Sequence, residues 1–173
     1  MPGFSSVTMG ALLMIASLVS AQTRTFTRDD LEFAFEFPSP AWRAVSRLDV
    51  HEHVDFVHGE GVAASYLHVR KKLVTVGTGA AELFSQDEKW ELQKLPGYVV
   101  CCEGKGEDFA GTLQAKVFSY EFTSAGRPTS GRLYYLKVDN RTFYVLHFRV
   151  GTDKLSDLRD DMNLIARSFH LKK

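Results

Sequence analysis

The strongest constraint on the fold is that the strands predicted between Leu113 and Val150 carry apolar side chains on both faces. In the first of these strands the residues of the two faces are Phe118, Tyr120 and Phe122 on one side and Leu113, Ala115 and Val117 on the other. A sheet with two apolar faces has to be covered on both sides. The sequence therefore predicts a layered domain that combines helices with a sheet.

Alternating apolar residues predict seven strands, and the last two are joined at Asp139-Asn140, which suits a tight antiparallel hairpin. The predicted strands are Leu31–Phe37, Val50–His58, Val62–Thr75, Tyr98–Glu103, Leu113–Thr123, Gly131–Asp139 and Arg141–Val150. Pro38 and Pro40 end the first strand, because proline cannot donate to a ladder.

Helical spacing predicts two helices. The first covers Ala80–Leu95, with a capping box at Ser85 and Glu88, a break near Ser85 and a stop at Pro96-Gly97. The second begins after a cap in Gly151-Thr152-Asp153 and has one apolar stripe, made of Leu155, Leu158, Met162, Ile165 and Phe169.

Residues 1–21 have the pattern of a signal peptide. The apolar run from Ala11 to Ala21 is too short to span a bilayer, and small residues at Val19 and Ala21 place the cleavage after Ala21. We expect a signal peptide over 1–21, a short polar tail over 22–29 and a single domain over 30–173. Because the segment before Ala11 holds no lysine or arginine, an uncleaved anchor and a misassigned start codon stay open as alternatives. The expected location is periplasmic or extracellular, without stable membrane insertion after cleavage.

The charges balance at 21 lysines and arginines against 21 aspartates and glutamates, which provides no field to attract nucleic acid. We therefore expect no nucleic-acid partner. The only cysteines, Cys101 and Cys102, are adjacent and point to opposite faces of a strand, so they cannot easily bridge. One buried and one exposed thiol are expected rather than a redox or nucleophilic pair.

Short motifs at the two ends of the domain carry a family resemblance. They are Phe35, Phe37, Pro38 and Trp42 at the start and Tyr144, Leu146, Phe148, Ile165, Ser168 and Phe169 at the end. Over about Leu31 to Leu171 the chain resembles the PsbP-like family, which includes the extrinsic photosystem II protein, a Ran-binding relative and many bacterial exported proteins. The resemblance implies an α+β fold: an α-β-α sandwich with a central, mainly antiparallel sheet of about six or seven strands and helices on its faces. The family resembles a scaffold for binding and assembly without a shared catalytic set, so it implies almost nothing about chemistry.

The sequence HEHVD is the one candidate metal site. His51, His53 and Asp55 are spaced by two, so on a strand they project from one face, and His58 could join them if the strand ends there. Imidazole and carboxylate suit zinc, copper or nickel. The alternative is a solvated polar face, since no Glu-x-x-His or Cys-x-x-Cys spacing supports a closed site.

No motif predicts a catalytic or cofactor-binding residue, so the chain is expected to be no enzyme. The chain lacks a Gly-x-Ser-x-Gly elbow, and Gly77-Thr78-Gly79 lacks the third glycine of a nucleotide site. His147 is expected to be a packed, hydrogen-bonded core histidine. The leading expectation is an exported, non-catalytic module that binds an unidentified protein or small molecule; metal binding is the alternative. An enzymatic site assembled from distant residues is a third class, which only a structure reveals.

Overall fold

The computed structural model describes residues 23–45 and 53–173, except for the side chains of residues 53, 62 and 102–105. The predicted signal peptide over 1–21 and His51 lie outside the described residues. The strands are β1 (Arg24–Phe26), β2 (Phe33–Phe37), β3 (Trp42–Val45), β4 (His53–His58), β5 (Ser65–Leu73), β6 (Val99–Ala110), β7 (Gln114–Ser124), β8 (Arg127–Lys137), β9 (Thr142–Gly151) and β10 (His170–Leu171). The α-helices are α1 (Ala80–Trp90) and α2 (Leu155–Ser168).

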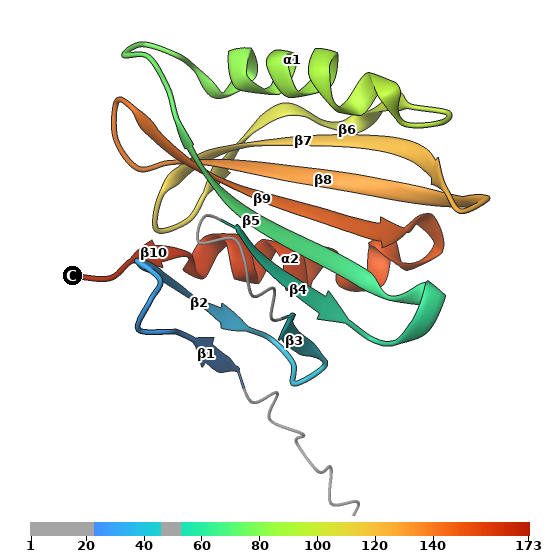
Figure 1. The fold of residues 1–173 in the computed structure, drawn as a ribbon, viewed down its shortest axis with the longest axis horizontal. Helices are drawn as coiled ribbons and strands as arrows, with labels where there is room; N and C mark the ends of the chain where they lie inside the picture. The colour runs from blue at the N-terminus through green and yellow to red at the C-terminus, as the bar shows by residue number, and fades with distance from the viewer. Residues whose placement is uncertain (1–22, 46–52) are drawn as a thin grey trace, which may run out of the picture.

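The described chain forms a seven-stranded sheet in the order β3-β4-β5-β9-β8-β7-β6, and every pairing is antiparallel. Helix α1 lies on one face and α2 on the other (Figure 1). The predicted α+β sandwich with a mainly antiparallel sheet is confirmed. The β8–β9 hairpin is antiparallel, as the Asp139-Asn140 turn predicts.

A three-stranded sheet, β1-β2-β10, lies beside α2 and completes the layer on that face of the large sheet (Figure 1). Its strand β2 contributes Phe33, Phe35 and Phe37 to a core that also contains Trp42. Phe169, directly after α2, stacks on Phe33 with ring centroids 5.1 Å apart. The motifs that carry the family resemblance at the two ends of the chain therefore meet in one aromatic core.

The opposite face is packed by α1 over only part of its width. Leu83 and Phe84 of α1 are buried against aromatic residues of β7 and β8, and Phe84 stacks on Phe118 at 4.2 Å. The prediction that the 113–150 block is covered on both faces is thus confirmed. Nearer β4, the same face carries polar and charged side chains, which α1 does not bury.

The predicted start of the first helix at Ala80 is confirmed, but the capping box and break near Ser85 and the predicted cap of the second helix are wrong. Helix α1 runs unbroken through Ser85, whose hydroxyl donates back to the Ala81 carbonyl at 3.1 Å instead of capping a new helix. The N-cap of α2 is Lys154, without a side-chain cap, because Thr152–Lys154 forms a 3-10 turn first. The apolar stripe of α2 is confirmed, with Leu158, Met162 and Ile165 buried.

Short strands account for the other differences from the prediction. Part of the predicted polar tail forms β1, which pairs with β2, and Trp42 begins β3. The predicted strand ending at Glu103 continues to Ala110, past register shifts that disturb its alternation.

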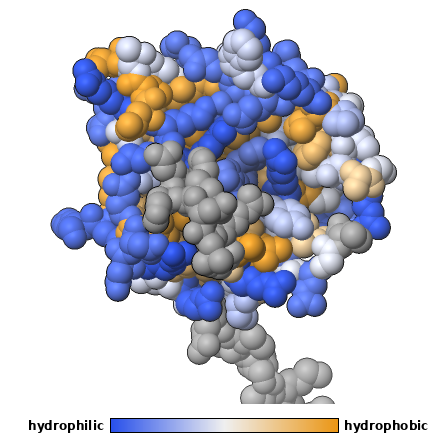
Figure 2. Space-filling model, viewed as in Figure 1, coloured by the Kyte–Doolittle hydropathy of each residue, from blue (hydrophilic) through white to orange (hydrophobic). Residues whose placement is uncertain are grey.

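Among the described residues no helix is long and apolar enough to cross a membrane. In the space-filling view, hydrophilic residues cover much of the visible face and apolar residues form separate patches (Figure 2).

Candidate functional site

A groove of about 1080 Å³ lies on the part of the sheet face that α1 leaves uncovered. Its floor is formed by side chains of β4, β5 and β9. Its walls are the β7–β8 turn, the segment Gly151–Lys154 and Glu91, just after α1. We call this hollow the open groove. Imidazole, guanidinium and carboxylate groups converge in it, namely those of His68, His147, Arg70, Arg127, Arg149 and Asp55.

Antiparallel pairing places the polar residues of the floor in one row across the sheet. Val45 is the partner of Asp55, Asp55 of His68, and His68 of His147. Directly paired residues of neighbouring strands project from the same face, so their side chains are neighbours. Residues from four strands are thereby brought together although they span more than a hundred positions of the sequence.

Asp55 and His68 form the first interacting pair of this row. Nδ1 of His68 hydrogen-bonds to Oδ1 of Asp55, and both side chains are partly exposed, at 35% for His68 and 20% for Asp55. The hydrogen bond to the carboxylate fixes the orientation of the imidazole ring, as a hydrogen bond to one ring nitrogen of a histidine commonly does.

His147 and Tyr120 form the second pair. The Tyr120 hydroxyl lies 2.6 Å from Nε2 of His147, although the two residues stand on strands separated by β8. The approach is possible because β8 has Gly131 at this position; a Cβ there would lie 2.1 Å from the tyrosine ring. The prediction of a packed, hydrogen-bonded His147 is confirmed.

Burial controls the protonation of this pair. Burial, reinforced by the nearby charge of Arg149, holds the pKa of His147 well below its ordinary value, so the imidazole is neutral. Burial also raises the pKa of Tyr120 to about 12, which keeps its phenol protonated. Tyr120 therefore donates to the lone pair on Nε2 of His147.

Arg149 is an exposed cation of the groove, as is Arg127 at the start of β8. Its Cζ lies 5.7 Å from the centroid of the Phe122 ring, and its Nε lies 3.5 Å from Nε2 of His147. On the neighbouring strand its direct partner is Tyr66, which is 50% exposed. The guanidinium is thus flanked by aromatic groups and open to the groove.

Arg70 has a different environment, because it joins the sheet to α1. Its Nη2 donates to Asp87 at 2.7 Å and its Nη1 to Glu91 at 3.1 Å. The buried Asp87 also accepts hydrogen bonds from Lys72 and, at 2.7 Å, from Tyr135. Burial first, and then the charge of Asp87, raise the pKa of Tyr135. This network fixes α1 on the sheet, together with Glu91, the residue after it that forms one wall of the groove.

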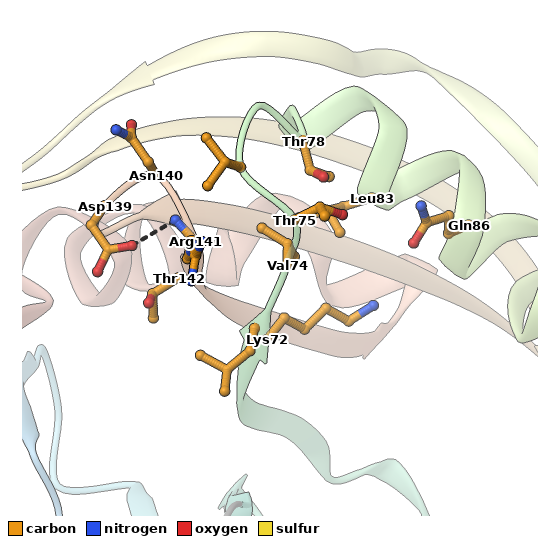
Figure 3. Close-up of a pocket in the computed structure, with 12 residues that line it drawn as sticks. Lys72, Val74, Thr75, Thr78, Leu83, Gln86, Asp139, Asn140, Arg141 and Thr142 are labelled. Atoms are coloured by element: carbon orange, nitrogen blue, oxygen red, sulfur yellow. Dashed lines mark hydrogen bonds between the residues drawn. The ribbon is translucent and has the colours of Figure 1, made fainter.

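A second hollow, of about 1250 Å³, lies between the start of α1 and the β8–β9 turn (Figure 3). Its polar groups serve local structure: Oδ1 of Asp139 accepts from the Arg141 backbone at 2.7 Å, and Lys72 pairs with Asp87. That backbone bond lowers the pKa of Asp139, as it stabilises the carboxylate. With Lys72 and Asp139 committed in this way, this hollow is the weaker candidate.

The structure places only part of the predicted metal group. Asp55 lines the open groove, His53 belongs to β4 without a described side chain, and His51 lies outside the described residues. His58 contacts Trp42 on the opposite face, with ring centroids 5.1 Å apart, so it does not join Asp55. Among the side chains that the structure describes, which do not include those of residues 53 and 102–105, no group of three or more His, Cys, Asp or Glu is arranged to hold a metal ion.

Sequence reasoning missed most of the groove. His68, Arg70 and Arg149 are separated in the sequence, and only strand register places them near Asp55. A signal was present in β5, where His68 and Arg70 alternate with the buried Leu67 and Val69. Polar residues along one face of a central strand indicate that no helix covers this part of the sheet.

Cys101 is partly exposed, and the side chain of Cys102 is not among those that the structure describes.

No protein-family model and no curated protein matches this sequence. Solved structures do match. Cyanobacterial PsbP (CyanoP) from Synechocystis sp. PCC 6803 superposes with a TM-score of 0.63 at 10% identity, over 93% of this chain and 99% of that chain. LpqN, involved in cell envelope biogenesis of Mycobacterium tuberculosis, gives 0.56 at 16% identity, over 88% and 91%.

A protein from Bacteroides thetaiotaomicron gives a TM-score of 0.57 at 11% identity. The match covers 88% of this chain and 49% of that protein. The chain thus spans about half the length of that protein. These likenesses establish the fold: the chain has the PsbP-like architecture, and the resemblance predicted from its sequence is confirmed at that level.

Proposed function

We propose that the chain is an exported, non-catalytic binding module and that the open groove takes a small-molecule ligand. The observation that carries the proposal is the convergence of His68, His147, Arg149 and aromatic side chains in a hollow of about 1080 Å³. A hollow with apolar walls and a few converging polar groups is typical of a ligand site.

The pairing of the titratable groups supports binding rather than catalysis. Asp55 pairs with His68, and Arg70 pairs with Asp87 and Glu91. The hydroxyl that contacts His147 belongs to Tyr120, whose raised pKa of about 12 makes its phenolate scarce at neutral pH. These groups position one another and supply no activated nucleophile.

The sequence of the leader supports export, with its apolar run from Ala11 to Ala21. The likeness to LpqN, a protein of cell envelope biogenesis, agrees with a role outside the cytosol. Mass analysis of the native product tests this part. A mature chain that begins at Gln22 is expected, and a product that retains Met1 would contradict it.

A groove-filling substitution tests the binding site. Thr129 lines the groove, so Thr129→Phe should fill it, whereas Gln114→Phe adds the same ring to an exposed position elsewhere on the sheet. The probe is 8-anilinonaphthalene-1-sulfonate, whose fluorescence rises in apolar sites. We expect binding by the wild type and Gln114→Phe and a loss of at least about tenfold in affinity in Thr129→Phe. Equal binding by all three proteins would refute the groove as the ligand site.

The absence of catalysis is tested with p-nitrophenyl esters. The wild type and His68→Gln are expected to hydrolyse them at the same slow rate. If the wild type turns the ester over and His68→Gln abolishes turnover, the non-catalytic proposal fails, and an enzyme assembled around Asp55 and His68 takes its place.

Metal binding by His51, His53 and Asp55 remains a second candidate. One observation favours it: the pairing of β4 with β5 sets His68 opposite Asp55, so a further imidazole lies on the same face. Imidazole and carboxylate together suit a divalent transition metal.

A further inference from the structure

The geometry points to Arg149 as the anchor for a carboxylate, so that the open groove selects organic acids with an apolar body. This inference rests on the proposed function and deepens it by naming the ligand class.

The contact with the Phe122 ring limits the positions of the Arg149 guanidinium before any ligand binds. Its Cζ lies 5.7 Å from the Phe122 centroid, a distance at which a cation is attracted to the ring face. Phe122 is itself buried, so it is a fixed support. A planar guanidinium held in this way offers parallel N–H groups that match the two oxygens of a carboxylate.

The charges around Arg149 leave it open to an external anion. No carboxylate among the described residues forms a salt bridge with it. By contrast, Arg70 pairs with two carboxylates, and Nζ of Lys154 donates to the Ala63 carbonyl at 3.0 Å. Asp55, which stands on the same face, is engaged by His68. Arg127, at the start of β8, also lines the groove and is exposed, but Arg149 has in addition the contact with the buried Phe122 ring. Arg149 is therefore the exposed cation of this groove with a fixed support.

Apolar side chains next to Arg149 define the rest of the ligand. Tyr66 is the direct cross-strand partner of Arg149, and Val45 is the partner of Asp55 on the same face. Tyr66 is 50% and Val45 39% exposed, and both line the groove. Exposed apolar surface beside an available cation matches a molecule with an acidic group at one end and an apolar body at the other.

A matched set of probes tests the ligand class by calorimetry at neutral pH. The probes are 2-naphthoate, the uncharged 2-naphthamide, and acetate, which has the acid without the ring system. We expect 2-naphthoate to bind about tenfold or more tightly than either of the other two, because it alone satisfies both parts of the groove.

Variants of Arg149 test the carboxylate anchor separately from binding of the ring system in the groove. Arg149→Gln should weaken 2-naphthoate about tenfold and leave 2-naphthamide unchanged, and Arg149→Lys should restore only part of the loss, since it lacks the planar fork. Arg141→Gln removes the same charge at an exposed position outside the groove and should change neither affinity. Thermal unfolding of each variant confirms that it is folded.

The possible failures are distinguishable. If Arg149→Gln binds both ring probes as the wild type does while Thr129→Phe blocks them, the groove stands and the carboxylate anchor is refuted. If 2-naphthamide binds as tightly as 2-naphthoate to the wild type, the selectivity for acids is refuted. If no probe binds, or Thr129→Phe has no effect on those that do, the inference and the proposed function both fail.

Discussion

The hydroxyl of Tyr120 reaches Nε2 of His147, 2.6 Å away, by passing over the backbone of Gly131 on the strand between them. A bond between residues on two strands that are not neighbours requires the intervening position to lack a side chain. Here the missing Cβ is essential, because it would overlap the tyrosine ring. Because Gly131 has no side chain, Tyr120 in the core beneath α1 can hydrogen-bond to His147 in the floor of the open groove.

Gly131→Ala should destabilise the protein by about 1–3 kcal/mol, because the added methyl group has to displace the Tyr120 ring. In a Tyr120→Ala background the same substitution should cost much less, which urea unfolding of the four proteins measures as a coupling energy. Gly79→Ala is the control, since a Cβ there meets nothing within 4 Å. Equal costs in both backgrounds would show that the overlap with Tyr120 is not the cause.

Lowering the pH from 7.5 to 5.5 should destabilise the fold through His147. Its folded-state pKa lies below the unfolded value because of burial and the charges of Arg149, Arg70 and His68. The unfolded state therefore binds a proton first, and stability is lost as the pH falls below about 6.5, by about 1.4 kcal/mol one unit lower.

Thermal unfolding across this pH range measures the His147 effect. His147→Gln should flatten the dependence of the unfolding temperature on pH, whatever the stability of this variant at neutral pH. His58→Gln is the comparison, because partial burial also lowers the pKa of His58. An unchanged slope in His147→Gln would contradict the assignment.

Asp87→Asn should be among the most destabilising single substitutions outside the apolar core. It removes the charge that Arg70 and Lys72 share while leaving both cations partly buried. Breaking a buried pair of this kind costs about 3–5 kcal/mol. Glu91→Gln removes a carboxylate from the same arginine at a half-exposed position and should cost less than about 1 kcal/mol. Chemical denaturation distinguishes the two, and similar losses would mean that Asp87 does not anchor α1.

The metal prediction is tested by elemental analysis of protein purified without an affinity tag. If His51, His53 and Asp55 hold a metal, the wild type should contain about one equivalent of zinc, copper or nickel, and His53→Ala should contain far less. His170→Ala removes an exposed histidine elsewhere and serves as the control. Equal, substoichiometric metal in wild type and His53→Ala would end the metal hypothesis.

The layers of the fold were predictable from the sequence because each depends on a local pattern. The alternation around Phe118 and Tyr120 requires cover on both faces, and the stripe of Leu158, Met162 and Ile165 specifies one buried side of a helix. The same reasoning placed His147 in a packed environment. These inferences use neighbours in the sequence, which strand and helix geometry fixes.

The groove was not predictable, because it depends on strand order. His68 comes to lie between Asp55 and His147 only because β5 pairs with both β4 and β9. The helix caps were missed for a related reason: the Ser85 hydroxyl had a competing partner in its own helix, and Thr152 bonds to Ser130 of β8 at 3.2 Å. Side chains with several available partners cannot be assigned from spacing alone.

The ends of the domain are built around each other. The Ser168 hydroxyl accepts the Glu36 backbone N–H at 2.9 Å, from 132 positions away, and β2 lies between β1 and β10. During synthesis on the ribosome, β2 therefore lacks one of its two strand partners until residues 170–171 have emerged. The small sheet must close last, and contacts this distant in sequence are slow to form. A chain that stops before His170 therefore leaves one edge of β2 without its strand partner, although every strand of the seven-stranded sheet is already present.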